Sequence, residues 1–188
     1  MKKVLLILAH PNKDSLSAKL LDFYYHGATE KGYEIRQFFL GDINFDLNLA
    51  KGYKEIQELE PDLKKAQENI VWADHLVFAF PIWWYSFPAL LKGFIDRVFL
   101  PGFAFKYKEG SPVPEKLLQG KTADIICTSG APKINYFLKN GNIGPKLLKN
   151  ILKFCGIKTR KSVLIGSVVA ELSDDKLEYY KKLVSKII

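Results

Sequence analysis

The chain has 188 residues, of which 48% are hydrophobic and 26% are charged. This length allows one substantial core, and the composition is that of a globular protein rather than a disordered one. The formal net charge is +8. Because the lysines are scattered and form no basic run, we expect a solvated basic surface and no nucleic-acid partner, with attraction of an anionic substrate as the alternative.

The chain shows no sign of a membrane span or a leader. No apolar run approaches the roughly 20 residues that a spanning helix needs. The first apolar run, residues 4–9, is shorter than the roughly 7–15 residues of a signal-peptide core, so we interpret it as a buried strand in a cytoplasmic protein. The two cysteines, Cys127 and Cys155, are too few for a disulfide framework and are expected to be buried.

Strand and helix patterns alternate from one end of the chain to the other. Apolar or β-rich runs predict strands at residues 4–9, 34–39, 75–80, 122–127 and 161–169. Helical spacing of apolar residues predicts helices from Ser15 to Gly32 and at residues 61–72, 88–99, 143–154 and 174–188. Two connections are irregular, 41–61 and 102–120, and the first is either partly helical or a functional loop.

This alternation predicts an α/β fold. We expect one domain over residues 1–188, with a doubly wound five-stranded parallel sheet of order 2-1-3-4-5 and helices on both faces. Ligands of such sheets bind at the carboxyl ends of the strands, so the loops that follow the strands are the candidates for a site.

Several familiar motifs are absent. No GxGxxG follows the first strand, and no GxSxG nucleophile elbow is present. The triplet Gly120-Lys121-Thr122 is similar to the end of a P-loop, but Glu115 stands where the first glycine belongs and the triplet precedes a strand. The three histidines show no metal-ligand spacing, and we expect no metal site.

The loop after the first strand is a candidate anion site. It runs from His10 to Ser17 and leads into the first predicted helix. Free N–H groups at a helix N-terminus attract phosphate, and the hydroxyls of Ser15 and Ser17 and the ring of His10 add donors around Leu16. Capping of the helix by Ser15 is the ordinary interpretation, and the two roles are compatible.

Two further loops complete the candidate site. After the third strand comes an aromatic turn between two prolines: Pro81, Ile82, Trp83, Trp84 and Tyr85. These rings either cover a flat ligand or pack against neighbouring helices or a partner chain. After the fourth strand come Thr128, Ser129, Gly130 and Ala131, with Tyr136 a few residues on. Together the three loops predict a phosphate at the first and an aromatic ring system, a flavin, between the other two.

These motifs resemble the flavodoxin-like NAD(P)H:quinone oxidoreductase family over nearly the whole chain. The stretch from Phe80 through Gly93 carries the resemblance most specifically. It implies that the backbone of Ile82, Trp83, Trp84 and Tyr85 contacts the isoalloxazine. It also implies that residues 128–131 lie against the pyrimidine edge, with Tyr136 near the flavin O2.

The resemblance also implies a cofactor and a partner, and the chain departs from the family pattern at two positions. It favours FMN over FAD, because the C-terminal extension of the larger FAD-using members is missing. It implies a homodimer with Trp84, Phe105 and Tyr107 near the interface, and Tyr107 in the pocket of the partner subunit. Phe105 replaces a tyrosine of the best-known members, and Asn142 replaces a histidine that stabilises charge on the reduced flavin.

The implied function is two-electron reduction of quinones by NAD(P)H, in a ping-pong sequence at one shared pocket. Gly130 and Tyr136 would stabilise negative charge near the flavin N1 and O2, so their roles and that of Tyr107 are catalytic. Three alternatives stay open: a regulatory flavoprotein subunit of a transporter, a non-catalytic electron carrier, and a flavin-free structural domain.

Overall fold

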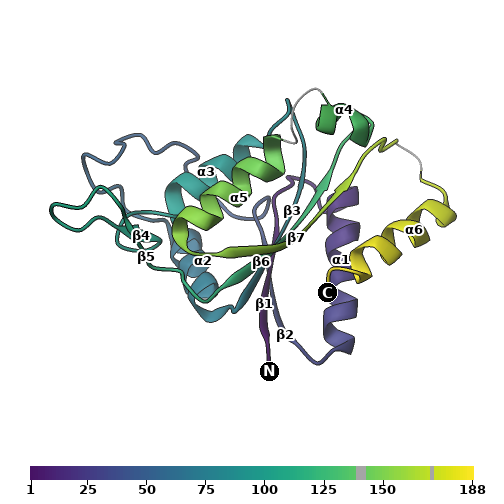
Figure 1. The fold of residues 1–188 in the computed structure, drawn as a ribbon, viewed down its shortest axis with the longest axis horizontal. Helices are drawn as coiled ribbons and strands as arrows, with labels where there is room; N and C mark the ends of the chain where they lie inside the picture. The colour runs from purple at the N-terminus through teal and green to yellow at the C-terminus, as the bar shows by residue number, and fades with distance from the viewer. Residues whose placement is uncertain (139–142, 170–171) are drawn as a thin grey trace.

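The centre of the molecule is a five-stranded parallel sheet. In the computed structural model, which describes residues 1–138, 143–169 and 172–188, the strand order is β2-β1-β3-β6-β7 (Figure 1). Its strands are β1 (Lys3–Leu8), β2 (Glu34–Phe39), β3 (His75–Pro81), β6 (Thr122–Thr128) and β7 (Lys158–Ile165). Counted among these five strands the order is 2-1-3-4-5, so the predicted fold class is confirmed.

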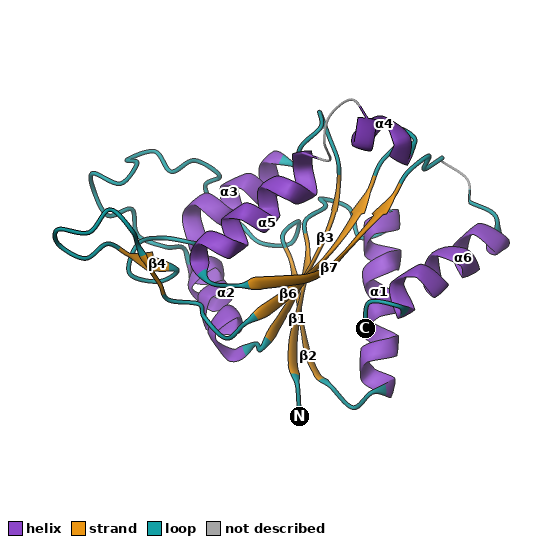
Figure 2. Cartoon of the chain, in the orientation of Figure 1, coloured by secondary structure: helices purple, strands orange, loops and turns teal. Residues whose placement is uncertain are grey.

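Helices cover both faces of this sheet, as Figure 2 shows. One face carries α1 (Leu16–Glu30) and α6 (Asp174–Ser185), and the other carries α2 (Pro61–Trp72), α3 (Ala89–Val98) and α5 (Ile143–Cys155). Alternation along the buried strands sends successive side chains to opposite faces. Leu6 therefore joins the apolar cluster beneath α1 and α6, whereas Leu5 joins the larger cluster beneath the other three helices.

The structure adds elements that the sequence pattern did not predict. A sixth helix, α4 (Lys133–Leu138), follows β6, and its six residues are too few for a helical repeat to show. The segment 102–120 contains a two-stranded antiparallel sheet of β4 (Phe105–Lys106) and β5 (Glu115–Lys116). Each of these strands is two residues long, below the length at which alternation can be recognised.

The last strand was predicted at residues 161–169 and is wrong by several residues, since β7 starts at Lys158 and ends at Ile165. Its first half is polar and exposed because β7 lies at the edge of the sheet, so it lacks the apolar run expected of a covered strand. Gly166 follows its last residue, and a Cβ there would lie 2.7 Å from the backbone N of Lys133.

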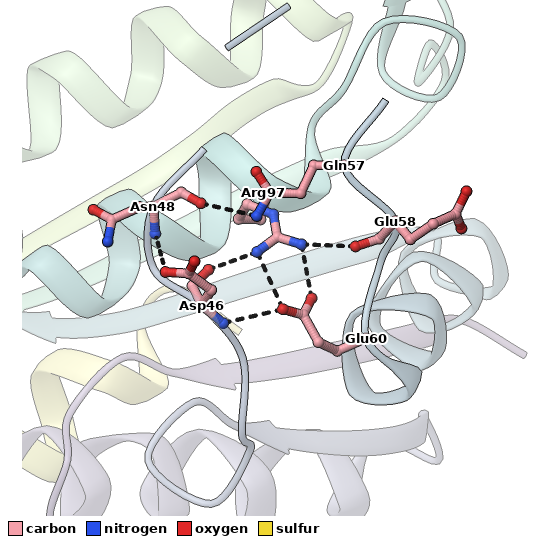
Figure 3. A network of polar contacts seen from close by, with 6 residues as sticks. All are labelled: Asp46, Asn48, Gln57, Glu58, Glu60 and Arg97. Atoms are coloured by element: carbon pink, nitrogen blue, oxygen red, sulfur yellow. Dashed lines mark hydrogen bonds and ion pairs between the residues drawn. The ribbon is translucent and has the colours of Figure 1, made fainter. Parts of the chain in front are cut away.

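The long connection 41–60 forms no helix and is instead held by one buried arginine of α3 (Figure 3). Arg97 is fully buried and donates to the carbonyls of Asp46 at 2.7 Å and Glu58 at 2.9 Å. Its two terminal nitrogens also reach the Glu60 carboxylate at 3.2 and 2.8 Å. The guanidinium therefore replaces the regular backbone bonding that this segment lacks.

A second buried polar cluster lies between β3 and β6, towards the amino ends of the strands. His75 is fully buried, and its Nε2 lies 3.0 Å from Asp124 Oδ2 while its Nδ1 lies 2.7 Å from Thr122 Oγ1. Asp124 Oδ2 also accepts from the Tyr24 hydroxyl at 3.4 Å.

Within the part of the chain that the structure describes, no helix has the length and apolar character to cross a bilayer.

Candidate functional site

Three strand-end loops meet in a cleft of about 260 Å³ at the carboxyl ends of β1, β3 and β6. Parallel strands place these ends on one edge of the sheet, which is where doubly wound sheets bind ligands. The cleft is lined by His10, Ser15, Leu16, Ser17, Pro81, Ile82, Trp83, Thr128, Ser129, Gly130 and Val168. Ten of these eleven positions are among the residues that the sequence pointed to.

The first loop presents the N-terminus of α1 to the cleft. Ser15 is the N-cap, and its Oγ accepts the N–H of Ala18 at 3.3 Å. The first N–H groups of a helix have no acceptor within the helix, so those of Leu16 and Ser17, two residues that line the cleft, are available to a ligand. Ser17 is buried, with its hydroxyl 3.2 Å from that of Thr128, and this contact ties the first loop to the end of β6.

His10 is a partly buried member of the first loop. Burial of the ring lowers its pKa below the ordinary value, although a backbone hydrogen bond to Asn12 acts in the opposite direction. Its Nδ1 lies 2.9 Å from both the backbone N and the carbonyl O of Asn12, so it accepts from the N–H in one tautomer and donates to the carbonyl in the other. His10 also packs edge-on against Trp83, with ring centroids 5.7 Å apart, so the first two loops are in direct contact.

The aromatic corner is a tight two-residue turn with a strained backbone. Trp83 and Ser86 exchange both backbone hydrogen bonds, at 2.9 and 3.0 Å. The two residues between them, Trp84 and Tyr85, have φ of 49° and 63°. Such left-handed residues are normally glycine or asparagine, and each non-glycine residue costs about 1–2 kcal/mol. Strain of this kind is concentrated at functional sites.

The rings of the corner remain open to solvent. Trp84 is 95% exposed, Tyr85 52% and Trp83 45%. The prediction that they lie at the corner is met, but within one chain only Trp83 lines the cleft. The strained backbone and the exposed rings of Trp84 and Tyr85 are therefore available for contacts outside this chain's own core.

The third loop is organised by Ser129. Its backbone N–H donates to Ile165 at 2.8 Å, and its hydroxyl accepts the N–H of Ala131 at 3.0 Å. The same hydroxyl lies 2.7 Å from the hydroxyl of Tyr136, which is buried. A Cβ built on Gly130 would meet nothing within 4 Å, so the backbone there lies open towards the cleft.

Three other predicted residues, Ala131, Tyr136 and Tyr107, lie beside or away from the cleft. Ala131 and Tyr136 stand behind Ser129, and the ring of Tyr136 is 6.3 Å from that of Tyr85. Tyr107 follows β4 and packs against Phe105 at 5.8 Å, outside the cleft. Asn142, the position that replaces the family's histidine, lies outside the described residues.

Val168 is the one lining residue that sequence reasoning missed. It follows β7, and its N–H donates to the carbonyl of Ser129 at 3.0 Å. The preceding residue, Ser167, has φ of 56° and donates its N–H to Ala131. A predicted strand end at residue 169 hid this position, because the true strand ends at Ile165 and leaves Val168 free to fold over the cleft.

A larger hollow, of about 680 Å³, runs along α1 beside β2. Its walls include Phe23, Phe39 and Leu177, and its polar side chains are those of an ordinary helix surface. None of its lining residues comes from the loops after β3 or β6, so we assign the candidate site to the smaller cleft at the strand ends.

Among residues 1–138, 143–169 and 172–188, no cluster of three metal-ligating side chains occurs.

The arrangement can therefore bind an anion and a flat ring side by side. The α1 N-terminus with Ser15, Ser17 and His10 supplies donors for a phosphate. The backbone around Ile82 and Gly130 supplies edges for a heterocycle. None of the described residues that line the cleft is acidic, which suits a negatively charged ligand.

Comparisons with known proteins point in one direction. A family model described as a flavodoxin-like fold matches residues 2–187. The uncharacterized NAD(P)H oxidoreductase YcaK of Escherichia coli K12 is 30% identical, over 99% of this chain and 95% of its own length. NAD(P)H dehydrogenase (quinone) 1 of Cavia porcellus is 28% identical, over 100% of this chain and 78% of its own.

A solved structure shows the same fold. The FMN-dependent NADH-azoreductase of Bacillus anthracis, crystallised in complex with FMN, superposes with a TM-score of 0.73. The match covers 100% of this chain and 97% of that one, at 23% sequence identity. At this identity the likeness establishes the shared architecture.

Proposed function

Because the chain belongs to the family with the flavodoxin-like fold, we propose that it is a flavin-dependent oxidoreductase that transfers electrons from NAD(P)H to quinones or similar acceptors. The observation that carries the proposal is the joining of a helix N-terminus, an aromatic corner and an open glycine loop in one cleft. The relative at 30% identity is named as an NAD(P)H oxidoreductase, and the relative at 28% identity as an NAD(P)H dehydrogenase (quinone).

The donors that line the cleft suit a flavin mononucleotide. The N-terminus of α1, with Ser15 and Ser17, would hold the phosphate, and the ring of His10 would add a donor. The backbone from Ile82 to Tyr85 and the open backbone at Gly130 would hold the ring system. FMN is also the form bound by the Bacillus anthracis structure of the same fold.

A flavin held by these residues would supply the redox chemistry, which is two-electron transfer from NAD(P)H to the acceptor. The chain's own residues bind and orient. The strained turn at Trp84 and Tyr85 fixes the position of one wall, and the Ser17–Thr128 contact holds two loops in register. Holding the two reactants in the right orientation is the main contribution that a protein makes to hydride transfer between a nicotinamide and a flavin that are stacked on each other.

We assign charge stabilisation to the third loop. The N–H of Gly130, which lines the cleft, and the hydroxyl of Tyr136, which stands behind Ser129, would supply the donors. Donors aimed at developing negative charge lower the barrier most when they are fixed beforehand, and Ser129 holds this loop by accepting the N–H of Ala131 and donating to the Tyr136 hydroxyl. In this account no side chain acts as an essential acid or base.

A homodimer is part of the same proposal. Trp84 is 95% exposed and Tyr107 56%, and both are aromatic. Aromatic side chains of this size are enriched at interfaces between chains. With a second copy against this face, Tyr107 would complete the pocket of its partner. A flavin-loaded protein that is monomeric in size-exclusion chromatography and fully active would contradict the shared pocket.

We place the enzyme in the cytoplasm, where NAD(P)H is supplied.

The function is tested by initial-rate kinetics on the FMN-loaded protein. With NADH or NADPH varied at several concentrations of a benzoquinone, double-reciprocal plots should be parallel lines, because donor and acceptor use the same cleft in turn. Ser17→Ala should weaken FMN binding by about 1–2 kcal/mol, or roughly fivefold to thirtyfold. The matched control is Ser173→Ala at the N-cap of α6, where the side chain caps nothing. Intersecting lines, or equal FMN affinity in both variants, would count against the proposal.

A further inference from the structure

The chain has a net charge of +8, and several of its lysines lie around a second hollow, at the opposite edge of the sheet from the cleft. This hollow has a volume of about 470 Å³ and lies where the end of α5, the start of β7 and the segment after β5 meet (Figure 1). No acidic side chain lines it among the described residues, whereas four lysines do: Lys116, Lys149, Lys153 and Lys158. The hollow is therefore cationic on three different elements.

Its floor is built by a close approach that only glycine allows. Gly156 has φ of 98°, and a Cβ there would lie 3.0 Å from Gln119 and 3.1 Å from Lys116. The N–H of Leu118 donates to the carbonyl of Cys155 at 3.1 Å. The segment after β5 is thus fixed against the end of α5, and the lysines on both sides are held around one space.

These lysines are not needed to cap the helix. Basic residues near a helix C-terminus commonly bind its last carbonyls. Here the backbone does so, since the N–H of Ile157 donates to Leu152 at 2.9 Å and that of Gly156 to Lys153 at 3.2 Å. The ammonium groups of the hollow remain available for another ligand.

Nor are the four ammonium groups neutralised by carboxylates. In the described part of the chain none of them forms an ion pair, whereas the neighbouring Lys108 pairs with Glu115 at 3.3 Å. Thr159 also lines the hollow, and its Oγ1 is buried without a hydrogen-bond partner among the described residues. Clustered cations without neighbouring acids are the chemistry that recognises phosphate oxygens.

We propose that this hollow binds a small polyphosphate anion, either a nucleoside polyphosphate or an inorganic polyphosphate chain. Cations spread over three elements match a chain of linked phosphates better than a single phosphate. The site lies at the amino ends of the strands, so it goes beyond the proposed function and does not depend on it.

The test is a ¹H–¹⁵N NMR titration of protein saturated with FMN, so that the cleft cannot take the probe. Sodium tripolyphosphate should shift the amides of Gly156, Lys158 and Thr159, and should bind at least about tenfold more tightly than orthophosphate. ATP distinguishes the two sources. Tighter binding of ATP than of tripolyphosphate supports a nucleotide, and equal or weaker binding supports the inorganic chain.

A matched pair of variants separates the hollow from general surface charge. Lys149→Gln/Lys158→Gln should weaken tripolyphosphate binding by about tenfold, and Lys176→Gln/Lys182→Gln on α6, with the same change of charge, by less than about twofold. Shifts that map elsewhere, equal losses in the two variants, or no preference over orthophosphate would overturn the proposal. A short DNA duplex that binds more tightly than ATP and is weakened equally by both variants would overturn it as well.

Discussion

Replacing Arg97 with methionine should destabilise the protein by several kcal/mol. The change removes two bonds from a charged donor to backbone carbonyls, at 2.7 and 2.9 Å, and the paired contact with Glu60. Bonds to charged groups contribute about 1.5–3 kcal/mol each, and breaking a buried ion pair costs about 3–5 kcal/mol. Because the Glu60 side chain is 29% exposed, its carboxylate regains some water, so we expect a loss of roughly 3–4 kcal/mol.

Urea denaturation followed by circular dichroism measures this loss directly. In thermal unfolding it corresponds to roughly 6–16 °C for a chain of this size. The control is Lys92→Gln on the same helix, which breaks an exposed pair with Asp96 at 2.6 Å and should cost no more than about 0.5 kcal/mol. An Arg97→Met protein within about 1 kcal/mol of the wild type would refute the view that this side chain holds the segment 41–60.

Acid provides a second readout of the same contact. Burial alone would raise the pKa of Glu60, but hydrogen bonds from the N–H of Asp46, from its own backbone and from Arg97 together lower it. A carboxyl with a lowered pKa stabilises the fold above its unfolded pKa, near 4.3, and loses that contribution as the pH falls through the folded value. This acid-dependent loss should be smaller in Arg97→Met than in the wild type.

Three further outcomes follow from the buried and strained groups. Burial lowers the pKa of His75, although Asp124 acts in the opposite direction. The free energy of unfolding should therefore fall as the pH drops below about 6.5, by up to about 1.4 kcal/mol per pH unit. In urea titrations at several pH values, His75→Gln should make this slope smaller. Trp84→Asn relieves a left-handed residue that is 95% exposed, so it should raise the stability of the flavin-free protein by up to about 1 kcal/mol; a loss of stability would show that the turn is not strained. Tyr136→Phe should lower kcat with FMN still bound and leave measurable turnover, and complete loss of activity would contradict a supporting role for the hydroxyl.

The fold and the place of the cleft could be predicted because both follow from local patterns. Alternating strand and helix signals fix a parallel sheet, and parallel strands bring the loops of Ser15, Ile82 and Gly130 to one edge. Ten of the eleven lining residues lie on those loops. Val168 could not be found in this way, because the edge strand β7 is polar at its start and its end was misplaced.

Contacts between distant segments were beyond the reach of the sequence. Arg97 stands in a helical pattern where an arginine is normally exposed, and its acceptors are carbonyls 39 and 51 positions away. The basic hollow likewise depends on the close approach of Gly156 to Gln119, which no local pattern reveals. Scattered lysines along the chain become a cluster only after the sheet has formed.

The most direct test of the central claim is anaerobic reduction of the FMN-loaded protein. Addition of NADH or NADPH should rapidly bleach the visible absorption of the bound flavin, and a benzoquinone added afterwards should restore it. Mass spectrometry of the released flavin identifies the cofactor. A protein that binds no flavin, or whose bound flavin stays oxidised with both nicotinamides, would contradict the account.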